Sequence, residues 1–218
     1  MAWTRRAVIA GLAASGLAGC EEMAGLPDPA PPPAPLPETP PDHYAARRDG
    51  RFSIPAVRTD EIPGWLLRQV VVYPGTEPEG TIEVYSDARL LYHVLPDGWA
   101  VRYGISVGRE GLGWTGNAEV YRTAHWPTWT PTPSMIERDP SLERWADGQA
   151  GGPSNPLGAR ALYMRTLATG ADEGIRIHGT PEWRSIGRAA SAGCFRMLQQ
   201  DVIDLYGRAG RGTRVVVV

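Results

Sequence analysis

Residues 99–107 read Trp-Ala-Val-Arg-Tyr-Gly-Ile-Ser-Val, with a large apolar side chain at every second position. A period of two over nine residues predicts a β-strand with one buried face and one face exposed to water. Pro96-Asp97-Gly98, directly before it, has the residues of a tight turn, and residues 89–95 form another apolar run. The sequence therefore predicts a β-hairpin over residues 89–107.

Further strands and short helices are predicted on both sides of this hairpin. Residues 66–72 form one apolar segment, residues 81–85 alternate as a strand, and residues 213–218 end in valines that suit a buried strand. Residues 201–208 predict a short helix. Many strands with few short helices predict a mainly β domain, either a sandwich or a barrel.

The middle of the chain, residues 108–158, is rich in Gly, Pro and Trp. Pro133 and Pro140 follow Thr132 and Asp139, so short helices with N-caps are expected to begin there. We expect the rest of this segment to be a long irregular insertion, and we assign no element to residues 43–62.

Composition excludes several classes of function. The chain has 218 residues, a net charge of -2, two cysteines and 22 basic residues, all of them arginine. The charge argues against a nucleic-acid binder, and the lack of lysine excludes Schiff-base chemistry and a P-loop lysine. No Cys and His cluster has metal-ligand spacing, so Cys194 is the first candidate for a nucleophile.

The N-terminus has the pattern of an export signal. Arg5 and Arg6 precede an apolar run over residues 7–18, which is too short to span a bilayer comfortably. The run ends in Leu-Ala-Gly-Cys20, which resembles the lipobox of bacterial lipoproteins and implies cleavage before Cys20 and lipidation of its thiol. Residues 4–9 resemble a twin-arginine signal. An ordinary Sec signal or an uncleaved anchor is the alternative.

The signal also predicts a location and a domain plan. The residue after Cys20 is Glu21 and not the Asp that usually retains lipoproteins, so we expect a periplasmic protein anchored in the outer membrane rather than the inner one. Nine of the fifteen residues 27–41 are proline, which predicts an extended spacer. The expected plan is a signal peptide over 1–19, a lipidated N-terminus, linker and unassigned segment over 20–64, and a domain over 65–218.

Two residues of the segment 175–197 are candidates for catalysis. A cysteine attacks a carbonyl as its thiolate, and a nearby imidazole can take the proton, so Cys194 and His178 form a possible pair. Gly193 allows a tight turn before the cysteine, and the amides of Gly193 and Cys194 are plausible oxyanion donors. Taken alone, both side chains have a structural alternative, because a single Cys is most often a small buried apolar residue.

The whole pattern resembles the L,D-transpeptidase (YkuD) family. The motif residues are His178-Gly179-Thr180, Ile186-Gly187 and Ser191-Ala192-Gly193-Cys194-Phe195-Arg196-Met197, and blocks at 102–109, 126–131, 151–160 and 201–206 match as well. The resemblance implies a β-sandwich with the cysteine loop at one edge. It also implies that Cys194 is the nucleophile, that His178 is the base, that the carbonyl of Gly179 orients the imidazole, and that no metal or cofactor takes part.

Other site residues follow from the same resemblance. Ser191 would shape the cysteine loop, and Arg196 would either meet a substrate carboxylate or form a structural ion pair. Trp126 and Trp129 would line a substrate groove or belong to the core. The family often has His where this chain has Ala192, which leaves the acceptor side of the site open.

The implied reaction is acyl transfer from a peptidoglycan stem tetrapeptide through a thioester, with release of D-alanine. The acceptor would be a second stem peptide, giving a 3→3 cross-link, or an envelope protein, whereas water would make the enzyme an L,D-carboxypeptidase. A non-catalytic peptidoglycan-binding lipoprotein and a thiol redox protein are the competing hypotheses. No nucleic acid is expected as a partner.

Overall fold

The computed structural model describes residues 39–108, 114–190 and 194–218. The chain divides into two units, Met1–Ala34 and Pro35–Val218, and the described residues all belong to the second. The predicted export signal, Cys20 and most of the spacer therefore lie outside the described residues, as do Ser191, Ala192 and Gly193. Among the described helices, none has the length and apolar character needed to cross a membrane.

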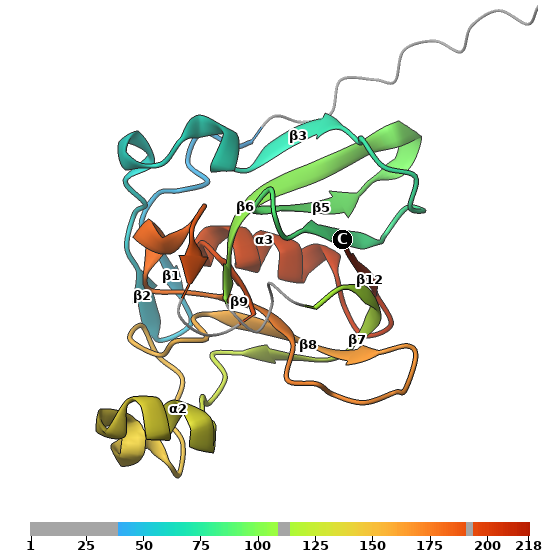
Figure 1. Cartoon of the computed structure of the whole chain (residues 1–218). Helices are drawn as coiled ribbons and strands as arrows, with labels where there is room; N and C mark the ends of the chain where they lie inside the picture. Colours follow the sequence, from blue (N-terminus) through green and yellow to red (C-terminus); the bar gives the residue numbers. More distant parts are fainter. Residues whose placement is uncertain (1–38, 109–113, 191–193) are drawn as a thin grey trace, which may run out of the picture. The chain divides into compact units, whose positions relative to one another are not determined.

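The described part of the chain is built mainly from strands (Figure 1). These strands are β1 (Arg47–Asp49), β2 (Phe52–Ile54), β3 (Gln69–Val72), β4 (Ile82–Tyr85), β5 (Leu90–Val94), β6 (Trp99–Gly108), β7 (Gly116–His125), β8 (Arg160–Thr166), β9 (Arg176–Gly179), β10 (Ala189–Ala190), β11 (Phe195–Met197) and β12 (Arg214–Val217).

Helices are few and short in the described residues. The two α-helices are α2 (Pro133–Arg138) and α3 (Gln199–Arg208), and the 3-10 helices are η1 (Thr59–Glu61), η2 (Gly64–Leu66), η3 (Pro96–Gly98), η4 (Pro140–Trp145) and η5 (Trp183–Ser185). The prediction of a mainly β domain with a few short helices is confirmed.

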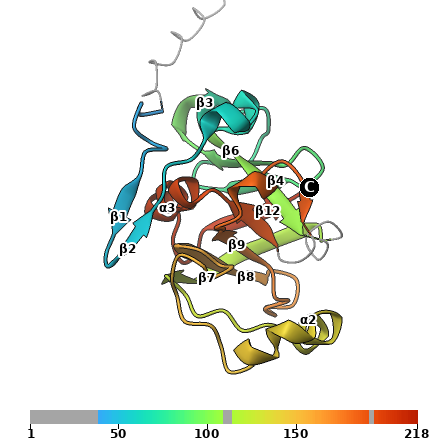
Figure 2. The same cartoon turned by 90° about the vertical axis from the view of Figure 1, so that its left-hand side faces the viewer.

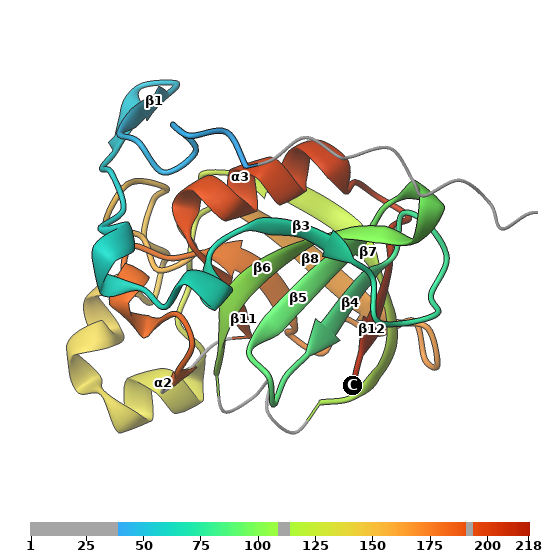
Figure 3. The same cartoon turned by 90° about the horizontal axis from the view of Figure 1, so that it is seen from above.

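One large sheet organises the domain. Its strand order is β10-β6-β11-β9-β8-β7-β12-β4-β5, and β5 pairs back to β6, so the order closes on itself. Figure 1 shows β3, β5 and β6 in an upper layer and β7 and β8 in a lower one, with α3 at a level between them, and Figure 3 shows the same elements from above. Val202 and Leu205 of α3 are fully buried in the core that the strands enclose, as the predicted helix over 201–208 requires.

The hairpin over residues 89–107 is confirmed as β5 and β6, which pair antiparallel. Asp97 and Gly98 of the turn have φ angles of 57° and 74°. Two consecutive residues in the left-handed region are typical of the turn that matches the twist of a hairpin, which explains the Asp-Gly pair.

The prediction of a water-exposed face on β6 is wrong. Tyr103, Ile105 and Val107 face the core, but the opposite face is covered too. A methyl group at Gly104 would overlap the backbone of Leu66 in η2, and the Ser106 hydroxyl lies 3.3 Å from that of Ser185 in η5. The small residues Gly104 and Ser106 therefore leave room for η2 and η5 to pack on this face, which is not exposed to water.

The segment 108–158 is less irregular than predicted, because it contains β7, which pairs with β8 and β12. Both short helices begin where proline predicted them, as α2 and η4. The Thr132 hydroxyl accepts from the Met135 amide, and the Asp139 carboxylate accepts from the Ser141 amide. Figure 2 shows α2 projecting from the sheet layers, below β7 and β8.

Residues 43–62, to which the sequence assigned no element, form part of the folded domain. β1 and β2 form a hairpin, and His43 Nε2 lies 2.8 Å from the buried Asp201 carboxylate at the start of α3. Gln200 of α3 donates to the carbonyl of Pro55. The described N-terminal segment is therefore fixed to the same helix that closes the core.

Candidate active site

Strand β9 places His178 on the face of the sheet opposite the core. Ile175 and Ile177 point into the core, so Arg176 and His178, which alternate with them, point the other way. β11 runs parallel to β9 and pairs Phe195 with Ile177. Cys194, one residue before Phe195, is therefore next to the Arg176 position and diagonal to His178.

The imidazole of His178 is held by its own strand. Its Nδ1 atom lies 2.7 Å from the carbonyl oxygen of Gly179, the hydrogen bond that the family resemblance implied. Burial is the largest cause that lowers the pKa of His178, to about 4; the hydrogen bond to the Gly179 carbonyl opposes it, and the positive charges of Arg196 and Arg176 add to the lowering. At neutral pH the ring is therefore uncharged.

Cys194 is the one cysteine in the described residues, and its thiol takes part in no disulfide there. It is only 6% exposed, and its Sγ donates to the carbonyl oxygen of Gly174 at 3.1 Å. Gly174 belongs to the turn before β9, so this contact ties the cysteine to the strand that carries His178.

Cys194 and His178 both line a cavity of about 790 Å³. One wall comes from the excursion that contains α2 and η4, including Trp129, Met135 and Leu142. The floor comes from β8, β9 and β11, and the sulfur and imidazole open into the same space. A volume of this size accommodates a peptide of several residues.

Arg196 also lines the cavity, at the position that pairs with His178. Its guanidinium lies 3.4 Å from the carboxylate of Glu182, and its side chain is 15% exposed against 72% for Glu182. The structure therefore contains the structural ion pair that was one of the two alternatives predicted for Arg196, and Arg196 lines the cavity as well.

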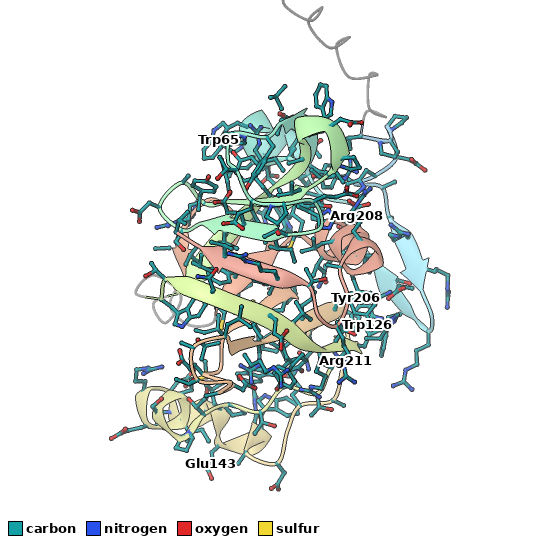
Figure 4. The ribbon with its side chains drawn as sticks, turned by 90° about the vertical axis from the view of Figure 1, so that its right-hand side faces the viewer. Trp65, Trp126, Glu143, Tyr206, Arg208 and Arg211 are labelled. Carbon is teal, nitrogen blue, oxygen red and sulfur yellow. The ribbon has the colours of Figure 1, made fainter. Side chains whose placement is uncertain are left out.

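The two tryptophans predicted to line a groove are in different places. Trp129 does line the cavity, but Trp126 does not. Trp126 packs against Phe52 of β2 with ring centroids 4.6 Å apart and the rings tilted by 53°, and its indole nitrogen donates to Asp49. Figure 4 shows it on the side of Tyr206, far from Glu143 of η4. Trp126 therefore anchors the N-terminal hairpin, which is why the groove prediction fails for it.

Among the cavity residues that the sequence did not predict are Arg122 on β7, Tyr163 on β8 and Arg176 on β9. They pair with one another across the three strands, Arg122 with Tyr163 and Tyr163 with Arg176. Only the register of the sheet brings them together, so no local motif could have identified them. The described residues contain no cluster of three or more His, Cys, Asp or Glu side chains placed to hold a metal ion.

Comparison with known proteins identifies the family. Residues 79–217 match the L,D-transpeptidase catalytic domain (YkuD), and the chain belongs to this family. A probable L,D-transpeptidase ErfK/SrfK of Escherichia coli is 32% identical over 158 residues, which cover 70% of this chain and 48% of that protein. A putative L,D-transpeptidase of Fuscovulum blasticum is 37% identical over 103 residues, covering 47% of this chain and 49% of the other. The chain thus spans about half the length of these curated relatives.

A solved structure from Brucella melitensis is 45% identical and covers 74% of this chain and 99% of its own, with a TM-score of 0.50. It is described as a probable carnitine operon oxidoreductase, a description that concerns that protein. The family match and the fold together define the domain as an L,D-transpeptidase catalytic domain.

Proposed function

We propose that the protein is a cysteine acyltransferase that uses peptidoglycan stem tetrapeptides as donors. The observation that carries the proposal is that His178 on β9 and Cys194, directly before the parallel strand β11, line one cavity of about 790 Å³. Membership of the L,D-transpeptidase family supplies the substrate class.

The chemistry follows from the state of the two side chains. His178 is neutral, and its Nδ1 hydrogen bond leaves Nε2 to accept the proton of the Cys194 thiol. The sulfur then attacks the carbonyl that follows the L-centre of the diamino acid. The carbon–nitrogen bond breaks, D-alanine leaves with the proton returned by the imidazolium, and a thioester remains. Backbone amides of Gly193 and Cys194 would stabilise the oxyanion.

The acceptor decides between related activities. An amine of a second stem peptide would release the thiol and form a 3→3 cross-link, and an amine of an envelope protein would anchor that protein. Water would make the enzyme an L,D-carboxypeptidase. The chain offers no lysine of its own as an acceptor, so any side-chain amine must come from another molecule.

The decisive experiment incubates the full chain with disaccharide tetrapeptides and follows both products and protein by mass spectrometry. We expect a thioester adduct on Cys194 and free D-alanine, with dimers if the acceptor is a stem peptide. Cys194→Ala should give neither. An adduct that persists in Cys194→Ala would refute Cys194 as the nucleophile. Binding to sacculi without any D-alanine release would instead support the non-catalytic hypothesis.

We further propose that the chain is exported and lipid-anchored through Cys20. The support is the sequence pattern, an apolar run ending in Leu-Ala-Gly-Cys. Labelling cells with a fatty-acid probe should tag the protein, and Cys20→Ser should abolish the label and release the protein from membranes. Unchanged labelling of Cys20→Ser would refute this part of the proposal. Separating the inner membrane from the outer membrane tests whether a lipoprotein with Glu21 after Cys20 is sorted to the outer membrane.

A further inference from the structure

A row of three side chains crosses the cavity floor away from Cys194. The Arg122 guanidinium carbon lies 3.6 Å from the centroid of the Tyr163 ring, and that of Arg176 lies 5.0 Å from the same centroid. Tyr163 is 4% exposed, so the ring is a fixed platform with one arginine reaching it from the strand on each side. Stacking on an aromatic face holds a guanidinium in place without using its N–H donors.

A β-bulge in β7 turns the side chain of Arg122 towards the ring of Tyr163. The register of β7 against β8 shifts between Val120 and Arg122, which pair with Met164 and Tyr163. Val120 is fully buried in the core, and without the shift Arg122, two residues on, would face the same way. The extra residue reverses the face, as bulges beside functional sites often do.

The row is positively charged and only partly neutralised. Within the described ranges no carboxylate forms an ion pair with Arg122, whose side chain is exposed at the cavity rim. Arg176 has one weak pair, with its Nη2 3.5 Å from the carboxylate of Asp172. Several N–H donors of the two guanidinium groups therefore face the cavity without an acidic partner.

We propose that Arg122 and Arg176, set on Tyr163, form a carboxylate-binding subsite that selects acidic donor stems. This inference rests on the proposed acyl transfer and specifies which part of the donor the cavity recognises. The group bound is a carboxylate remote from the scissile bond: the α-carboxylate of the γ-linked glutamate, or the free carboxylate at the distal centre of the diamino acid. Guanidinium groups bind carboxylates through paired N–H donors, which amides cannot match.

Distance favours these two carboxylates over that of the leaving D-alanine. Tyr163 is two strands from Cys194, and strands lie about 4.8 Å apart, so the platform lies roughly 10 Å from the sulfur. Bond lengths put the D-alanine carboxylate about 4 Å from the scissile carbonyl and the other two about 8 Å from it. The D-alanine carboxylate is left nearer to Arg196.

The test compares three donors: a disaccharide tetrapeptide with both remote carboxylates free, and two forms with one or the other amidated. Equilibrium binding is measured on the full chain carrying Cys194→Ala, with and without Arg122→Gln. Amidation of the recognised carboxylate should weaken binding about tenfold, and Arg122→Gln should weaken the free-acid donor by a similar factor. Amidation of the recognised carboxylate combined with Arg122→Gln should weaken binding no more than either change alone. The donor whose amidation shows this non-additivity identifies the carboxylate that binds.

Arg165→Gln is the matched control. Arg165 is on β8, the strand of Tyr163, but it forms an ion pair with Glu119 and does not line the cavity. Its substitution should therefore leave the affinities for all three donors unchanged. Equal weakening of all three donors by Arg122→Gln, or no weakening of any, would overturn the inference.

Failure of the two proposals can be told apart. Binding to the Cys194→Ala chain does not depend on turnover, so carboxylate selectivity without a thioester in the parent chain would refute acyl transfer alone. A thioester that forms equally fast from free and amidated donors, in the parent and in Arg122→Gln, would refute the subsite alone.

Discussion

The Nδ1 atom of His178 lies 2.7 Å from the carbonyl oxygen of Gly179, the next residue on β9. A carbonyl can only accept, so Nδ1 carries the proton and Nε2 of the neutral ring is free of one. Gly179 itself has no room for a side chain, because a methyl group there would overlap the amide of Gln199. The strand, the glycine and α3 together fix both the tautomer and the orientation of the imidazole.

Replacing His178 with Ala should slow acylation of Cys194 about 10²–10⁴-fold, the usual contribution of a general base. The measurement is the time course of the thioester adduct with a stem tetrapeptide. His125→Ala is the control, since His125 is exposed, packs against Tyr206 and does not line the cavity. An unchanged acylation rate in a folded His178→Ala protein would contradict the assignment of the base.

The rate of acylation should be nearly independent of pH between about 5 and 8. Burial lowers the pKa of His178 to about 4, so the imidazole stays neutral and able to accept a proton throughout this range. An ordinary histidine would lose half its basic form near pH 6.5. A profile of kcat/KM with a midpoint at that ordinary value would show that the pKa of the catalytic imidazole is not lowered.

The sequence predicted the hairpin, α3 and the Cys194–His178 pair because each depends on local signals. Alternation, an Asp-Gly turn and a motif can be read within a few residues. The buried second face of β6 could not be read in this way. Gly104 and Ser106 look like exposed positions until Leu66 and Ser185, distant in sequence, are placed against them.

The same limit applies to the site. Arg122 meets Tyr163 only because a bulge shifts the register of two strands that are separated by a long excursion. Trp126 sits in a Trp-Pro-rich stretch typical of a binding groove, yet its partner is Asp49, in a segment with no strand signal. The positions of Arg122 and Trp126 are therefore set by contacts between distant segments and not by the local sequence pattern.

Acid should destabilise the domain through His93 as well as His178. His93 is 7% exposed, its Nδ1 has no hydrogen-bond partner in the described structure, and burial lowers its pKa to about 4. Between pH 6.5 and 4 the unfolded chain binds more protons than the folded one, so stability is fully present above 6.5 and falls as pH drops. For each histidine the loss is about 2 kcal/mol between pH 7 and 5.

The measurement is the free energy of urea unfolding at the two pH values. His93→Leu should reduce the acid-induced loss by about half, because His178 still contributes its share. His125→Ala, which removes an exposed histidine, should leave the loss as it is in the parent. Identical pH dependence in His93→Leu and the parent would mean that His93 is not held neutral in the folded state.

Asp49 should be needed for the stability of the whole domain, although it lies far upstream of the motif residues. Its two carboxylate oxygens accept from Arg160 at 2.6 and 2.8 Å, and the side chains of Arg160 and Asp49 are 6% and 21% exposed. Asp49→Ala leaves a buried guanidinium without its counter-charge, which costs about 3 kcal/mol. Asp60→Ala, which breaks an exposed pair with Arg58, should change the unfolding free energy little. Equal effects of the two substitutions would show that the Asp49–Arg160 pair adds no more stability than an exposed ion pair does.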